Sequence, residues 1–147
     1  MSLLSDSSLF KTKASSTLNK DTKSFGKQYL TDGSLETCWN SDQGANQWII
    51  IEFTKQITAT QLSLMFQGGF TSTEVQVLAA VDSTPSASSA DWVPLMAIYP
   101  EDSNKEQLFA LSSEGPVAVR SVKLLFTLPS DTFGRIVIYK LDILGDV

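Results

Sequence analysis

A loop dense in polar side chains lies between two tryptophans, Trp39 and Trp48, and is the first segment of this sequence suited to recognising a ligand. Its candidate binding residues are Asn40, Ser41, Asp42 and Gln43. Amide, hydroxyl and carboxylate groups set this closely can offer convergent donors and acceptors to a peptide or a sugar. The alternative is that they satisfy their own backbone as Asx-turns. The sequence leaves both interpretations open.

Two further loops carry candidate binding residues. Gln67 precedes a pair of glycines, and Phe70 follows them, either as an exposed stacking residue or as an anchor packed beneath the loop. Arg135 stands where a loop enters the last predicted strand. An arginine there can grip a partner's carboxylate bidentately, or it can form an internal salt bridge with Asp42 or Asp131. We expect these loops and the polar loop to form one binding rim.

The residue types of this chain give little support for catalysis. The chain has no histidine and a single cysteine, Cys38. Histidine is the commonest general base and the commonest transition-metal ligand, so its absence removes both roles. Carboxylates remain, but neighbours such as Glu101 and Asp102 lie in a predicted turn, where water would solvate them. We expect no enzyme and no cofactor.

The charge balance argues against polyanionic partners. Sixteen acidic residues outnumber eleven basic ones, for a net charge of −5. Nucleic acids and anionic membranes are bound mainly through lysine and arginine, so we expect no direct nucleic-acid partner and no membrane partner. One cysteine cannot form an internal disulfide, and the first residues show no basic, apolar leader. We expect an intracellular protein.

The elements that must position these loops are β-strands. Apolar residues recur with the alternation typical of strands, and Gly- and Pro-containing turns separate the runs. The predicted strands are 47–53, 60–66, 75–81, 121–127 and 135–144, with weaker ones at 92–99 and 107–111. Many strands without alternating helices predict an all-β antiparallel sandwich, with Trp39 and Trp48 in its interior.

The remaining segments complete the predicted organisation. Residues 32–37 are expected to form a short helical turn capped by Asp32. Residues 82–91 are rich in Ser, Ala and Pro and predict a flexible loop inside the domain. We expect residues 1–10 to be a flexible tail and residues 11–147 to be a single domain.

Five segments in a fixed order carry a family resemblance. Leu30–Trp39 contains an Asp followed by Thr-x-Trp, Gln47–Phe53 opens with Gln-Trp, and Val119–Leu124, Phe133–Arg135 and Leu141–Gly145 follow. In this order they resemble discoidin domains, also called F5/8 type C or galactose-binding-like domains. The resemblance implies a jelly-roll β-sandwich that binds its ligand through loops at one end.

The resemblance also implies a candidate metal site. Asp32 and Thr37 match positions that bind structural calcium in sugar-binding members, and Asp142 offers a further carboxylate. Lys140 nearby opposes a cation. The alternative, in which Asp32 and Thr37 only cap their loop, is preferred.

A closer similarity rests on Phe25–Lys27, Cys38–Gly44, Phe66–Phe70, Tyr99–Asp102 and Phe133–Tyr139. Together these segments resemble a group of small nuclear-receptor-associated repressor proteins within the family. That similarity implies a protein or peptide partner, with a nuclear receptor as the candidate, in the nucleus or cytoplasm. Carbohydrate binding on the same rim is the alternative function.

Overall fold

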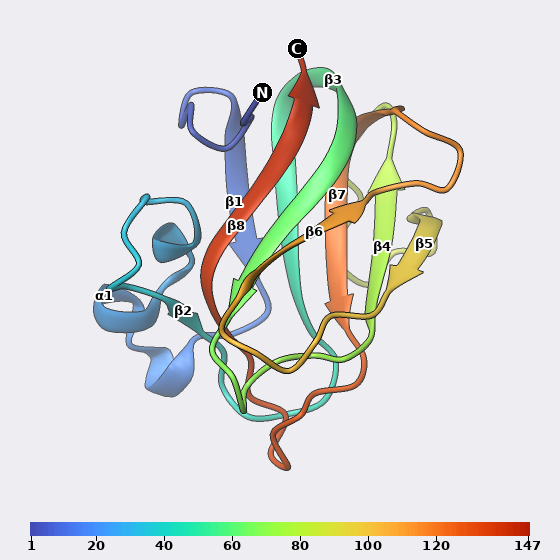
Figure 1. Cartoon of the computed structure of the whole chain (residues 1–147). Helices are drawn as coiled ribbons and strands as arrows, with labels where there is room; N and C mark the ends of the chain where they lie inside the picture. Colours follow the sequence, from blue (N-terminus) through green and yellow to red (C-terminus); the bar gives the residue numbers. More distant parts are fainter.

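Two stacked layers of antiparallel strands form the body of the protein in the computed structural model, which describes all 147 residues (Figure 1). Strands account for 46% of the residues and helices for 7%, which confirms the predicted all-β class. The strands are β1 (Phe10–Ala14), β2 (Trp39–Asn40), β3 (Gln47–Phe66), β4 (Val75–Ala80), β5 (Val93–Ile98), β6 (Glu106–Ala110), β7 (Val117–Phe126) and β8 (Val137–Asp146).

Strand β3 belongs to both layers. Its first half pairs with β1 and β7, so that Ile51 faces Thr12 and Val122. Its second half pairs with β6 and β8, so that Leu64 faces Gln107 and Leu141. The register of its pairing with β7 shifts between Glu52 and Ile57, where the strand bends over the end of the sandwich (Figure 1). The sequence predicted two strands here, because the exposed polar residues at the bend resemble a turn.

The main core lies between the layers and follows the strand alternation. Ile49, Ile51 and Phe53 of β3 point into it, and Trp39 is fully buried there against Phe126, as predicted. Ile50 points the other way, into a small cluster with Ala80 and Trp92. Trp48 packs against this outer cluster and is half-buried, so it lies outside the main core.

The loop between β4 and β5 covers the outer cluster. Lys123 Nζ donates to Ala87 O at 2.6 Å, and Trp92 Nε1 donates to Ser86 O at 2.9 Å. Burial lowers the pKa of Lys123. The predicted loop at 82–91 is therefore present and is hydrogen-bonded to the sheet beneath it.

The first residues depart from the expected flexible tail. Leu3 and Leu4 are buried in the main core, and Leu3 N donates to Ile143 O at 2.9 Å. Ser2 forms an isolated bridge with Leu144 of β8. Two adjacent leucines are apolar enough to make this segment part of the sandwich, although the residues around them are polar.

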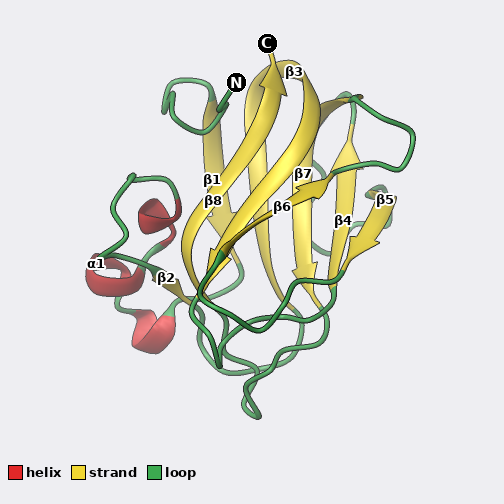
Figure 2. Cartoon of the chain, in the orientation of Figure 1, coloured by secondary structure: helices red, strands yellow, loops and turns green.

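Short helices cover one side of the sandwich and are coloured red in Figure 2. They are the 3₁₀ helix η1 (Leu18–Lys20), α1 (Thr22–Phe25) and the 3₁₀ helix η2 (Lys27–Leu30). The helical turn predicted at 32–37 was wrong: that segment is an irregular loop. Asp32 caps it by accepting hydrogen bonds from Ser34 N, at 3.0 Å, and from the Thr37 hydroxyl, at 2.5 Å. No helix combines the length and apolar character that a membrane span requires.

Candidate functional site

Four loops meet at the lower end of the sandwich in Figure 2, and we call them the loop rim: residues 41–46, 67–72, 99–105 and 127–135. Gly44 N donates to Phe133 O at 2.8 Å, which joins the first loop to the last. Gly69 N donates to Asp102 Oδ1 at 2.8 Å, which joins the two middle loops. The sequence predicted that three of these loops would lie together; the sheet register also brings in the loop after β5.

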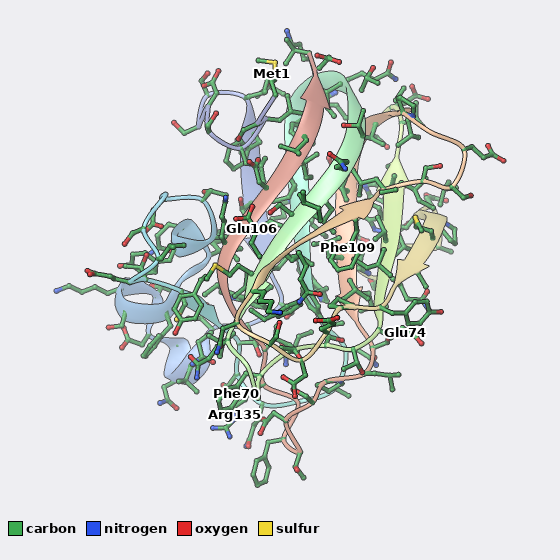
Figure 3. The ribbon with its side chains drawn as sticks, in the orientation of Figure 1. Met1, Phe70, Glu74, Glu106, Phe109 and Arg135 are labelled. Atoms are coloured by element: carbon green, nitrogen blue, oxygen red, sulfur yellow. The ribbon has the colours of Figure 1, made fainter.

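Arg135 is held in the rim by an ion pair and by two aromatic rings. Its Nε donates to Asp131 Oδ2 at 3.0 Å, and its Nη2 approaches Asp131 Oδ1 at 3.3 Å. The guanidinium also stacks on Phe70, 5.2 Å from the ring centroid, and on Phe133, at 5.6 Å. Figure 3 shows Phe70 and Arg135 beside each other at this end. The sequence suggested Asp42 or Asp131 as an internal partner, and Arg135 pairs with Asp131. The Nε and Nη2 donors of its guanidinium are therefore already occupied within the chain.

Arg135 and Asp131 each favour the charged form of the other. Hydrogen bonds from Arg135 lower the pKa of Asp131, and the carboxylate in turn raises the pKa of Arg135. The side chain of Asp131 is only 11% exposed, whereas that of Arg135 is 36% exposed. Arg135 therefore shapes the last loop from within and still presents part of its surface to solvent.

The polar loop after Trp39 is mostly occupied with its own backbone. Ser41 is fully buried; its hydroxyl accepts from Ile136 N and donates to Asp42 O, both at 2.9 Å. Asp42 Oδ1 accepts from Gln43 N at 3.0 Å, and Gln43 is exposed. Asn40 Oδ1 is buried without a hydrogen-bond partner. Ser41 is therefore structural and outside any contact surface, whereas Gln43 remains accessible.

Gln67 and Phe70, the candidate binding residues beside the double glycine, are both half-buried. Gln67 Oε1 accepts from the Tyr139 hydroxyl at 3.1 Å. Phe70 O accepts from Val137 N at 3.0 Å, and its ring lies under Arg135. Phe70 thus acts as a loop anchor with one stacked face rather than as a free platform.

Three large apolar side chains are among the exposed residues of the rim, and they were not among the residues predicted to bind. Tyr99 is 68% exposed, Phe133 61% and Leu128 53%. Val75 of β4 pairs with both Ile98 and Phe126, so β5 and β7 end at the same level on the two sides of β4. A signal was present in the sequence: Phe133 and Leu128 lie in a stretch rich in Pro, Ser, Asp and Gly, where a core residue is not expected.

The rim itself has no hollow. The surface contains three, of about 270–330 Å³, and none is lined by a residue of the loop rim. The exposed apolar side chains of the rim therefore do not line a cavity.

The calcium candidates do not fit a metal site. Asp32 and Thr37 bond to each other, and Asp142 Oδ1 accepts from Ile143 N at 2.8 Å and from Leu4 N at 3.3 Å. No group of three or more acidic, cysteine or histidine side chains is arranged to hold a metal ion. Calcium binds six to eight oxygens, often several of them carboxylates, which these positions do not supply.

Two named proteins are similar in sequence to this chain over most of its length. It is 43% identical over 133 residues to a protein from Xenopus laevis named nuclear receptor 2C2-associated protein, a match covering 90% of this chain and 91% of that one. The human protein of the same name is 40% identical over 134 residues, covering 91% and 90% of the two chains.

Solved structures share the fold at low identity. An F5/8 type C domain from Bacteroides fragilis superposes with a TM-score of 0.76 at 16% identity, covering 96% of this chain and 94% of that one. A chitosan-binding module from Paenibacillus, solved with chitotriose, gives a TM-score of 0.74 at 18% identity, covering 92% and 95%. These likenesses confirm the predicted discoidin-like β-sandwich.

The family model agrees with the architecture. The model of the F5/8 type C domain matches residues 11–138, which include most of the sandwich and all four loops of the rim. This chain is therefore a member of the F5/8 type C, or discoidin-like, domain family.

Proposed function

We propose that this protein is a non-catalytic binding module of the nucleus or cytoplasm whose loop rim binds a protein partner, with a nuclear receptor as the candidate. The observation that carries the proposal is the exposure of Phe133, Leu128 and Tyr99 on a rim without a hollow. Protruding aromatic and aliphatic side chains are the usual anchors of protein interfaces. The names of the relatives, nuclear receptor 2C2-associated proteins, supply the candidate partner.

Rigidity supports Phe133 as the central anchor. Its ring stacks with Arg135, which Asp131 holds in place, and its carbonyl accepts from Gly44 N. A side chain that is already positioned loses less conformational entropy when a partner covers it. This arrangement lets one exposed ring contribute a large share of the binding free energy.

The single thiol gives further support for a non-catalytic role. Cys38 is half-buried, and burial raises its pKa. A nucleophilic cysteine requires the opposite change, because the thiolate is the reactive form. Hydrogen bonds donated by Arg135 and Ser63 lower the pKa values of Asp131 and Glu106, which makes each carboxylate a weaker general base and leaves it no proton to donate as a general acid.

Carbohydrate binding on the same rim is less well supported. Sugar sites combine an exposed aromatic ring with polar groups in a concave site. Here Phe70 is half-buried beneath Arg135, and no hollow is lined by rim residues. The protein partner is therefore the function that we put forward.

The test compares two double variants of the whole chain for binding to a purified nuclear receptor 2C2. Phe133→Ser/Leu128→Ser removes the protruding rim, and Val81→Ser/Val93→Ser removes exposed apolar side chains elsewhere. We expect the first to weaken binding roughly tenfold or more, and the second to match the unaltered chain. Equal binding by both variants, or no binding by the unaltered chain, would remove the proposal. Saturable binding of chitotriose that is lost in the rim variant would establish the carbohydrate function instead.

A further inference from the structure

A hollow lined mainly by polar and charged residues lies beside the loop rim, between the end of β1 and the short helices. Its volume is about 320 Å³, and its lining includes Ser16, Thr17, Lys20, Thr22 and Lys27. Ser16 connects it to the rim, because its hydroxyl accepts from Asp42 N at 3.0 Å. The proposed function uses none of these lining residues.

The hollow lies in a basic region of an acidic protein. Five of the eleven basic residues fall between Lys11 and Lys27, and the same stretch contains one acidic residue, Asp21. Of these five lysines, only Lys13 has an ion pair, with Glu52. Lys20 and Lys27 therefore bring two uncompensated positive charges to one concave site.

The donors of the hollow have no acceptors within the chain. The ammonium groups of Lys20 and Lys27 and the hydroxyls of Thr17 and Thr22 make no side-chain hydrogen bond to the protein. The carboxylates of the neighbouring Asp21 and Asp42 are turned to backbone groups, Ser24 N at 3.1 Å and Gln43 N at 3.0 Å. The lining of the hollow thus includes four side chains whose donors are not paired with any carboxylate of the chain.

The backbone at Lys20 is strained in a way that suits a binding role. Asn19 and Lys20 have φ values of 54° and 57°, so two consecutive residues with side chains adopt the left-handed region. This conformation is unfavourable for residues other than glycine, and such strain concentrates at ligand sites. Here it accompanies the placement of Lys20 at the edge of the hollow.

We infer that this hollow binds a phosphoryl group carried by a phosphorylated serine or threonine of a protein partner. Two ammonium groups and two hydroxyls can surround a tetrahedral oxyanion and donate to its several oxygens. The small size of the hollow and the net charge of −5 favour one phosphorylated side chain over a nucleic-acid backbone, which needs an extended basic surface.

The test is a titration of the ¹⁵N-labelled whole chain, followed by amide chemical shifts at constant ionic strength. The probes are N-acetyl-phosphoserine amide and the unphosphorylated N-acetyl-serine amide. We expect the phosphorylated probe alone to shift the amides of Thr17, Lys20, Thr22 and Gln28 in a saturable manner. Lys20→Gln/Lys27→Gln should weaken this response roughly tenfold.

A matched variant controls for net charge. Lys11→Gln/Lys55→Gln removes the same two charges from exposed positions outside the hollow and should keep the affinity of the unaltered chain. Equal weakening in both variants would show diffuse charge attraction and would overturn the inference, as would equal shifts with the unphosphorylated probe. A single-stranded oligonucleotide that binds the hollow more tightly than phosphoserine would also overturn it in favour of nucleic acid.

Discussion

The guanidinium of Arg135 donates to both carboxylate oxygens of Asp131, four residues earlier in the same loop, at 3.0 and 3.3 Å. Asp131 Oδ2 also accepts from the backbone N of Arg135 at 3.0 Å. This one carboxylate therefore closes the loop that presents Phe133 to solvent. The arginine that the sequence suggested for gripping a partner instead holds its own loop in shape.

Acid should loosen this loop. Arg135 lowers the pKa of Asp131, so the ion pair stabilises the folded chain fully at pH values above the ordinary aspartate pKa of 3.8. This stabilisation is lost as the pH falls through the lowered pKa of Asp131. We expect the thermal midpoint of the unaltered chain to fall more steeply below about pH 4 than that of Asp131→Asn, which lacks this contribution. Asp91→Asn, at an exposed position without a side-chain partner, should leave the steep fall unchanged. Identical acid profiles for the unaltered chain and Asp131→Asn would contradict this role.

Gly134 should tolerate no side chain. Its φ is 82°, and a Cβ atom there would overlap the carbonyl of Gly44 in the neighbouring loop of the rim. Gly33 has a similar φ of 78°, but open space surrounds it. In urea denaturation, Gly33→Ala should cost about 1 kcal/mol from backbone strain, and Gly134→Ala about 2 kcal/mol more. Equal losses would mean that the two loops can separate freely.

Ser41 should contribute to stability rather than to recognition. Ser41→Ala removes the acceptor of Ile136 N and leaves a buried donor unpaired, which costs about 1–3 kcal/mol. Urea denaturation should show this loss, with Ser113→Ala, at an exposed position, as the unaffected control. A variant with unchanged stability but weakened partner binding would restore Ser41 to the contact surface.

The first residues should behave as part of the core. Leu3→Ala and Leu4→Ala each remove a buried side chain, and each should lower the free energy of unfolding by about 2–5 kcal/mol. Ser7→Ala, in the exposed turn that follows, should change it by less than about 0.5 kcal/mol. If all three variants unfold at the same denaturant concentration, the segment is a loose tail after all.

The strands and the core could be predicted from the sequence because both follow local periodicity. Alternating apolar residues such as Ile49, Ile51 and Phe53 share one face of a strand whatever the rest of the fold is. Phe133 and Leu128 were missed because the turn-rich composition around them indicates a loop, whereas their exposure on the rim depends on how the loops pack. The bend of β3 was missed because Thr54, Lys55 and Gln56 have the polar character of a turn.

The sequence by itself determined the β-rich layers, the burial of Trp39 and the loops available for binding. Tertiary structure decided which loops touch, since Gly44 and Phe133 meet only through the pairing of β2 with β8. It also selected Asp131 as the partner of Arg135, and it enclosed Leu3 and Leu4 beside β8. The physical reason is that alternation acts over neighbouring residues, whereas contacts between distant segments depend on strand register and on how the two layers stack.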